Sequence, residues 1–341
     1  MNILIVGANS KYAIELPYVK YLSDVSGVSK VDFFPAQNIF LEFYKKNLLN
    51  KLTYRAGLST VLNEINGALI EFIDKCKPDF IFVFKGMEIF PSTLKRARDM
   101  GVKLVNYNPD NPFVFTGRGS GNSNVRKSIG VYDLHLTYDA EVKSRIENEF
   151  KIKSKILPFG YELDQGLFEI CKQEIEINRA CFLGNPDSQR ARFVNNLASY
   201  KLPIDVYGHG WSRFVKSKYI AVYDAVYSDS FWKTLRKYRI QINLMRVHNP
   251  NSHNMRTFEV PAVGGIQLAP DTSDHRFFFS NGKEIFLYRN SDDCSNQAIE
   301  LLSWPSSSAL EVRENARSRS LRSSYSYKDR ALQVFNELIA L

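Results

Sequence analysis

Short apolar segments alternate with helical segments along most of this chain, and the alternation runs through twice. Segments such as NILIV at 2–6 and FIFVF at 80–84 are apolar at nearly every position, rather than at every second one. Strands of that kind are buried on both faces of a sheet. Strands separated by helices imply right-handed crossovers and parallel sheets that helices cover on both faces. The order of segments therefore predicts an α/β protein with Rossmann-like domains.

The alternation restarts where RACFLGN at 179–185 begins a second series. We predict an N-terminal domain over residues 1–160, a C-terminal domain over 178–322, and a final helix at 323–341 that crosses back to the N-terminal domain. A length of 341 residues also favours two domains over one. In such sheets ligands bind beyond the carboxyl ends of the strands. A cleft between the two domains is therefore the expected site.

Composition and charge narrow the function classes. No apolar run reaches the roughly 18–20 residues of a membrane helix, and MNILIVGANS lacks a basic leader, so we expect a cytoplasmic protein. The net charge of +9 is compatible with nucleic acid, an anionic membrane face or a phosphorylated small molecule. The absence of zinc-finger and RNA-binding signatures argues against nucleic acid. A solvated helix face, rather than an anion site, is expected for the basic tail RENARSRSLRSSYSYKDR.

The segment RTFEVPAVGGIQLAP at 256–270 places an arginine, an acid and two glycines before a strand-like run. With INLMRVHNPNSHNM ahead of it, this segment resembles the donor site of glycosyltransferases with the GT-B fold, specifically the CgeB-like, group 1 type. FLGNPDSQRARFVNNL, VYGHGW and FSNGKEIFLYRNSDD stand in the family's order, so the resemblance covers roughly residues 178–295. KPDFIFVFKG and VNYNPDNP match more loosely. The resemblance implies two Rossmann-like domains facing a cleft, and a nucleotide-sugar donor.

The resemblance assigns Glu259 to the donor ribose, whose two hydroxyls a carboxylate can accept together. The alternative is an exposed first-turn acid that the helix dipole favours. Arg256, three residues earlier, is predicted to hold the diphosphate beside free N–H groups of the helix start, or else to form an ion pair with Glu259. His253, Asn254 and Thr257 are predicted to contact phosphate or sugar, with cap and loop roles as the alternative.

Two glycine-containing turns complete the predicted donor site. The resemblance places Gly184 and Asn185, after the first strand of the second series, against the donor phosphate or sugar; an ordinary strand-to-helix turn is the alternative. Gly208 and Gly210 of YGHGW stand where the family packs the nucleotide base. The Gly-Gly pair at 264–265 is given a packing role, because glycine allows close approach of the backbone.

Many retaining members of this fold carry a second glutamate eight positions before the ribose-binding one, and Asn251 occupies that position here. The missing acid favours inversion, which needs a base for the proton of the acceptor hydroxyl. In this fold the base usually comes from the N-terminal domain. Asp110 in NPDNP is the predicted base, although that sequence also suits an Asx turn. Glu88, His135 and Asp139 are further candidates.

Spacing of acids and histidines argues against a metal. No two aspartates stand two positions apart, and no His-x-x-x-His pair occurs; the four cysteines are scattered and expected to be reduced. The sequence therefore predicts an enzyme without metal or cofactor, in which arginine and backbone dipoles offset leaving-group charge. The predicted reaction moves a hexosyl or deoxyhexosyl group from a nucleotide diphosphate to a glycan, lipid-linked or protein hydroxyl in polysaccharide biosynthesis, with peripheral contact at the inner membrane face.

Two alternatives stay open beside the transferase. Nucleotide-sugar 2-epimerases share the two-domain architecture, and a non-catalytic donor-binding protein of a polysaccharide cluster would keep the same segment. A NAD enzyme is disfavoured, because VGANSKYA at 6–13 lacks the Gly-x-Gly-x-x-Gly turn.

Overall fold

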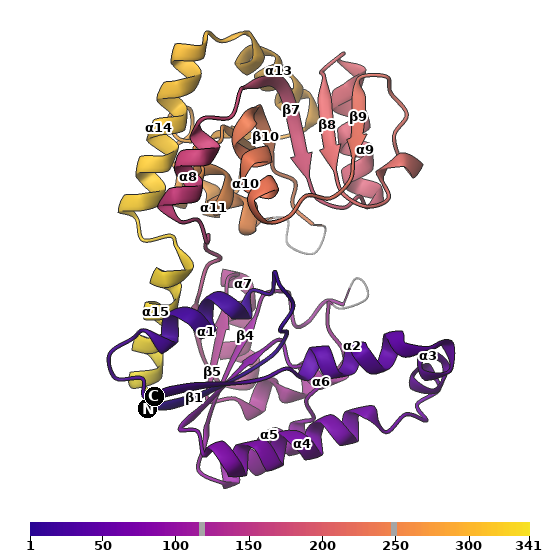
Figure 1. Ribbon diagram of the computed structural model, residues 1–341, viewed down its shortest axis with the longest axis vertical. Helices are drawn as coiled ribbons and strands as arrows, with labels where there is room; N and C mark the ends of the chain where they lie inside the picture. Colours follow the sequence, from indigo (N-terminus) through magenta and orange to yellow (C-terminus); the bar gives the residue numbers. More distant parts are fainter. Residues whose placement is uncertain (116–119, 247–250) are drawn as a thin grey trace. The chain divides into compact units, whose positions relative to one another are not determined.

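The computed structural model describes residues 1–115, 120–246 and 251–341. The chain forms two compact units, one of Met1–Pro158 with Tyr327–Leu341 and one of Phe159–Ser326. Each unit contains a six-stranded parallel sheet with helices packed against it (Figure 1). The predicted α/β class with two Rossmann-like sheets is confirmed.

The sheet of the first unit has the strand order β2-β1-β3-β4-β5-β6. Its strands are β1 (Asn2–Val6), β2 (Lys30–Phe34), β3 (Phe80–Phe84), β4 (Lys103–Asn108), β5 (Leu134–Thr137) and β6 (Lys153–Ile156). Its helical segments are α1 (Glu15–Ser23), α2 (Ala36–Lys46), α3 (Leu48–Arg55), α4 (Val61–Cys76), α5 (Pro91–Asp99), α6 (Ser123–Ser128), η1 (Ile129–Val131), α7 (Ala140–Arg145), η2 (Ile146–Phe150) and α15 (Tyr327–Ile339). Because β1 lies between β2 and β3, the strand order reverses at the β1–β3 pair.

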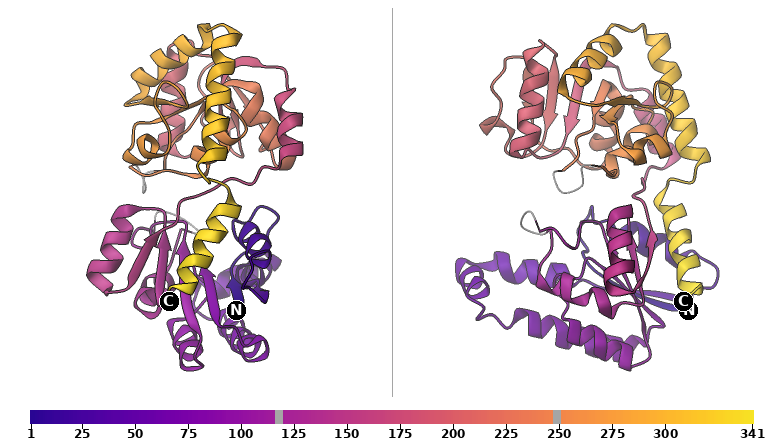
Figure 2. Two further views of the ribbon diagram at one scale, coloured as in Figure 1. Left: turned by 90° about the vertical axis from the view of Figure 1, so that its left-hand side faces the viewer. Right: turned by 180° about the vertical axis from the view of Figure 1, so that it is seen from behind.

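An apolar layer lies on each face of this first sheet. Buried residues of α4 and α5, among them Leu69 and Leu94, form one layer, and Tyr18 of α1 packs with Ala331 and Val334 of α15 in the other. Helices α1 and α15 come from opposite ends of the chain and contact each other (Figures 1 and 2). The prediction that the final helix returns to the N-terminal fold is therefore confirmed.

The sheet of the second unit has the strand order β12-β11-β10-β7-β8-β9. Its strands are β7 (Ile177–Leu183), β8 (Ile204–Tyr207), β9 (Ile220–Tyr223), β10 (Tyr238–Ile242), β11 (Gln267–Pro270) and β12 (Phe286–Tyr288). Its helical segments are α8 (Gln165–Lys172), α9 (Ser188–Ser199), η3 (Trp211–Arg213), α10 (Ser228–Lys237), α11 (Met255–Ala262), α12 (Ser273–Phe278), α13 (Ser291–Ser303) and α14 (Ser306–Arg322). Here the order reverses between β7 and β10.

One expectation about the basic tail is corrected. Part of that tail lies in α14, which is a regular helix, but its arginines are not all solvated: Arg313 and Arg317 are 3% and 7% exposed. Their guanidiniums donate hydrogen bonds to backbone carbonyls of other elements, such as those of Gly264 and Ala262. Local sequence could not show this burial, because the acceptors lie some fifty residues away along the chain.

Candidate functional site

The carboxyl ends of β7 and β10 meet where the strand order of the second sheet reverses. Arg190, in the first turn of α9, joins the loops that follow these two strands. Its guanidinium donates to the carbonyl of Asn185 after β7, at 3.3 Å, and to that of Leu244 after β10, at 3.1 Å. Such a switch point is where open α/β sheets bind ligands.

The charges of two further arginines, Arg246 and Arg256, act on Arg190 at this edge of the sheet. Burial lowers the pKa of Arg190, and the charges of Arg246 and Arg256 lower it further, against an opposing effect of Asp187. Arg246 is exposed at the end of a described range. The guanidinium of Arg256 lies 4.5 Å from the ring centre of Phe231. Asp187 lies 3.7 Å from Nε of Arg190, and Glu259 pairs with Arg256, so this edge offers guanidinium N–H donors to an anionic ligand such as a diphosphate.

Sequence reasoning missed two of these three arginines. Arg190 and Arg246 lie within the segments that resemble the family, but no local pattern separates them from ordinary surface arginines. Only their places in the order of elements mark them: Arg190 is in the first turn of the helix after β7, and Arg246 follows β10. Only the strand order brings those two places together.

Arg256 and Glu259 form an ion pair on α11. Glu259 is the fifth residue of the helix and is 6% exposed, so the alternative of an exposed first-turn acid is wrong. Within the described residues, Nε of Arg256 is buried without a hydrogen-bond partner. The alternative role for Arg256, pairing with Glu259, is thus present in the structure, and the donor contacts of both side chains stay predictions.

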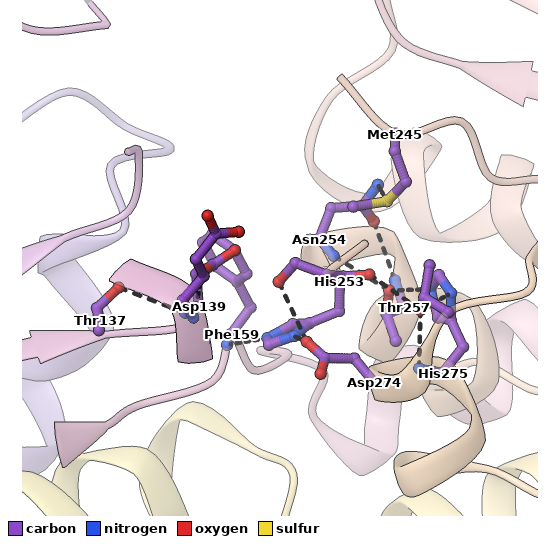
Figure 3. Close-up of polar contacts among 12 residues, drawn as sticks. Thr137, Asp139, Phe159, Met245, His253, Asn254, Thr257, Asp274 and His275 are labelled. Carbon is purple, nitrogen blue, oxygen red and sulfur yellow. Dashed lines mark hydrogen bonds and ion pairs between the residues drawn. The ribbon is translucent and has the colours of Figure 1, made fainter. Parts of the chain in front are cut away.

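Asn254 and Thr257 form a capping box at the start of α11 (Figure 3). The side-chain oxygen of Asn254 accepts the N–H of Thr257 at 3.3 Å, and the Thr257 hydroxyl accepts the N–H of Asn254 at 3.2 Å. The same hydroxyl lies 2.9 Å from Nε2 of His275, whose pKa burial lowers to about 4. Both side chains therefore have structural partners, and their predicted donor contacts are untested.

His253 is also engaged within the second unit (Figure 3). It is 1% exposed, with Nδ1 at 2.6 Å from the Asp274 carboxylate and Nε2 at 3.4 Å from the backbone N of Phe159. These contacts join the start of α11 to the start of the unit. A contact of His253 with the donor stays a prediction, and the structure gives this imidazole a packing role.

The turns after β7 and β8 lie against each other. A Cβ on Gly208 would stand 2.5 Å from the carbonyl oxygen of Gly184, and the indole N–H of Trp211 donates to that same oxygen at 2.8 Å. Gly210 has φ of +92°, a conformation that glycine adopts without strain. Asn185 accepts a backbone N–H of the β8 turn at 2.9 Å. Close packing of the two turns therefore explains why glycine and asparagine stand at these positions. Contact of these residues with a donor stays a prediction.

The switch point of the first sheet, after β1 and β3, carries charged groups. The ammonium of Lys85, the residue after β3, lies 2.5 Å from the carboxylate of Asp110. Glu15 accepts the N–H of Ala8, after β1, at 2.8 Å. The N–H of Asp110 donates to the side-chain oxygen of Asn108 at 3.0 Å. Asn111 accepts the N–H of Phe113 in the same way, at 2.9 Å. The Asx turns are therefore formed by the two asparagines, and the carboxylate of Asp110 pairs with a cation.

The remaining base candidates differ in their surroundings. Burial raises the pKa of Glu88 to about 7, against a lowering effect of Lys85. His135 is 2% exposed, its Nε2 lies 3.0 Å from the carbonyl oxygen of Ile129, and burial lowers its pKa to about 4. Asp139 caps α7 by accepting two backbone N–H groups (Figure 3). Of these further candidates, Glu88 is the one whose pKa lies near neutrality, and the base role of Asp110 stays a prediction.

Replacing Glu88 should change how stability depends on pH. Its pKa is about 7 in the fold against 4.5 for the free side chain, so between these values only the unfolded chain releases the proton. Stability of the parent protein should therefore fall by up to about 3 kcal/mol as pH rises from about 4.5 to 7. Glu88→Gln should remove the part of this pH-dependent fall in stability that comes from Glu88.

Urea unfolding at pH 5 and pH 8 measures this difference. Glu71→Gln, on an exposed position of α4, is the matched control and should keep the parent's pH dependence. Parallel pH profiles for Glu88→Gln and the parent would show that Glu88 is not held protonated by burial.

Neither a metal site nor a membrane span is found in the ranges that the structure describes. There, no three side chains of His, Cys, Asp or Glu are grouped so that they could hold a metal ion. No helix in the same ranges is both long and apolar enough to cross a bilayer. Metal independence therefore stays a prediction.

Comparison with known proteins supports the resemblance seen in the sequence. Residues 189–336 match the family model described as glycosyl transferase-like. The matched part begins in α9 and ends in α15, and it includes Arg190, Arg246 and all of α11. No curated protein matches the chain.

Three solved structures have a similar fold across almost the whole chain. HepE of Anabaena in complex with UDP has 12% identity and a TM-score of 0.64, with 100% of both chains covered. A glycosyltransferase from Rickettsia africae has 15% identity and a TM-score of 0.62, with 99% of this chain and 98% of that one covered. A proposed UDP-N-acetylglucosamine 2-epimerase from Listeria monocytogenes has 14% identity and a TM-score of 0.57, with 98% and 94% covered. The predicted GT-B type of fold is confirmed, and it is shared by more than one class of enzyme.

Proposed function

We propose that this chain, glycosyl transferase-like over residues 189–336 and of the GT-B fold, transfers a sugar from a nucleoside diphosphate to a hydroxyl group. The observation that supports this most directly is the group of three arginines, Arg190, Arg246 and Arg256, at the switch point of the second sheet. A diphosphate is the part of the donor that such a group recognises. Glu259, on the same helix as Arg256, is proposed to accept the ribose hydroxyls.

A uridine nucleotide is the first donor to test. HepE, which shares the fold, has been solved with UDP and with UDP-glucose. The acceptor is proposed to be a glycan, lipid-linked or protein hydroxyl, met in the cytoplasm or at the inner membrane face. The basic net charge of +9 favours an acceptor or surface that carries negative charge.

The proposed reaction is an inverting displacement. The acceptor oxygen forms a bond to the anomeric carbon as the bond from that carbon to the diphosphate breaks, and the diphosphate leaves with the electron pair. The acceptor proton passes to a carboxylate, for which Asp110 is proposed. Inversion is favoured by Asn251, which stands where many retaining members of this fold carry a glutamate. The arginines would stabilise the negative charge of the leaving group.

Incubation of the full chain with sugar nucleotides tests this function. UDP-, GDP- and dTDP-sugars should be offered with and without a panel of glycan, lipid-linked and peptide acceptors. We expect release of nucleoside diphosphate only with an acceptor, at a rate that excess EDTA leaves unchanged. Activity lost on chelation and restored by Mn²⁺ would contradict metal independence.

The same experiment separates the two alternatives. A new sugar nucleotide formed from the donor alone would identify an epimerase, as the similar fold of the proposed Listeria enzyme allows. Nucleotide binding without turnover on any acceptor would instead favour a donor-binding protein. The family match over residues 189–336 is the reason to place the transferase first.

A further inference from the structure

A second group of cations lies at the opposite edge of the second sheet. A cavity of about 510 Å³ opens beside α8 and α14, which lie side by side (Figures 1 and 2). It is lined by five basic residues and one acidic residue, namely Lys172, Arg236, Arg313, Arg317, Arg322 and Glu314. Of the residues that line the cavity, Arg236 lies shortly before β10 and Gly264 shortly before β11. The cavity is therefore at the amino ends of these strands, whereas the candidate donor residues are at the carboxyl ends.

Arg236 is the residue that the fold does not explain. Its side chain lines the cavity and the residue is only 9% exposed. Within the described ranges, no hydrogen bond or ion pair joins its guanidinium to another residue. Burial lowers its pKa, which reflects the cost of placing a charge there, and the charge of Glu176 acts in the opposite direction. A guanidinium in such a position is stabilised when an anion accepts its N–H groups.

Two further arginines hold fixed positions in the wall. Arg313 donates to the carbonyl oxygens of Arg236 and Gly264 at 2.8 and 3.0 Å and to the Glu176 carboxylate at 2.8 Å. Arg317 donates to the carbonyl of Ala262 at 2.6 Å. Because these bonds fix both side chains before any ligand arrives, little side-chain freedom is lost on binding.

The balance of charge in the wall is positive. Glu176 offsets part of the charge of Arg313, and Arg322 pairs with Glu284 at 3.0 Å. Arg236 and Arg317 have no carboxylate partner among the described residues, and Nε of Arg317 is buried without an acceptor. The unmet donors of the cavity thus belong to two guanidiniums in its wall. A phosphate group, with several acceptor oxygens, matches that arrangement.

Apolar groups complete the wall. The guanidinium of Arg317 lies 4.1 Å from the ring centre of Phe168, and Leu310 and Leu321 are 45% and 56% exposed. A volume of about 510 Å³ falls in the range of small-molecule sites and exceeds the needs of a single phosphate. A ligand that carries both a phosphate and an apolar part would use the whole cavity.

We propose that this cavity binds a phosphate or diphosphate group, held by Arg236 and Arg317, at a site separate from the one that takes the sugar nucleotide. The group can belong to a free diphosphate or to a lipid-linked one, whose chain would lie along Phe168, Leu310 and Leu321. The site is part of the folded second unit and does not depend on sugar transfer.

Calorimetric titration of the full chain tests the site, with inorganic pyrophosphate and farnesyl diphosphate as probes at constant ionic strength. Arg236→Gln should weaken one binding event about ten- to a hundredfold, since it removes a charge-assisted hydrogen bond. Arg256→Gln, the matched change at the opposite edge of the sheet, should leave that event unchanged. Ser318→Glu places a negative charge on an exposed lining position and should abolish the same binding event, because the new carboxylate repels the phosphate.

The outcome of the two probes identifies the source of the phosphate. Equal affinities point to a free diphosphate, and tighter binding of farnesyl diphosphate points to a lipid-linked one; both support the site. No saturable binding of either probe, or binding that neither Arg236→Gln nor Ser318→Glu weakens, would overturn it. Thermal unfolding without ligand is the structural control. Arg236→Gln should not lower the midpoint, since its guanidinium has no partner among the described residues, and a clear fall would mean that Arg236 serves the fold instead.

Discussion

Asp110→Asn should lower kcat by about a hundred- to ten-thousandfold and leave nucleotide-sugar binding nearly unchanged. The carboxylate follows β4 beside the switch point of the first sheet, where Lys85 holds it at 2.5 Å. An amide of the same shape cannot take the proton of an acceptor hydroxyl. Because the defect lies in the chemical step, the loss should persist when acceptor is saturating. Steady-state rates and calorimetric donor binding measure the two quantities.

Two further variants make the assignment of Asp110 specific. Asp99→Asn, at an exposed position of α5, is the matched control and should keep full activity. Glu88→Gln tests the competing acid, whose pKa burial raises to about 7, a value suited to a general base. Turnover close to that of the parent in folded Asp110→Asn, with a large loss in Glu88→Gln, would move the base role to Glu88.

The α/β class and both sheets could be predicted because the strands are buried on both faces. A strand such as β3, with FIFVF between a proline and a glycine, carries its own boundaries in the sequence. Helix α3 lacks such a signal, since its leucines Leu48, Leu49 and Leu52 stay exposed. Its sequence therefore has no clear stripe of residues to bury.

The candidate site was predictable only where it depends on local spacing. The Arg256–Glu259 pair follows from two residues three apart on one helix. Arg190 could not be identified in the same way, because its role comes from the reversal of strand order that joins the loops after β7 and β10. The donor contact of His253 stays a prediction, and its contacts with Asp274 and Phe159 could not be read from local spacing, because they lie 21 and 94 residues away along the chain.

Glu259→Ala should weaken nucleotide binding by about ten- to a hundredfold while the fold survives. The proposed bond joins a charged carboxylate to the ribose hydroxyls, and hydrogen bonds to charged groups contribute about 1.5–3 kcal/mol. The donor KM should rise by a similar factor. Calorimetry with UDP and steady-state kinetics measure the two effects, and Glu300→Ala on an exposed position of α13 is the control.

A comparison of uridine with UDP separates a direct role of Glu259 from an indirect one through Arg256. Glu259→Ala also breaks the ion pair that holds the Arg256 guanidinium on α11. If the carboxylate binds the ribose, uridine and UDP should lose affinity by the same factor, because both carry the ribose. If Glu259 only positions Arg256, the loss should appear for UDP and not for uridine, because only UDP carries the diphosphate. Unchanged affinity for both ligands in a folded Glu259→Ala protein would remove Glu259 from the donor site.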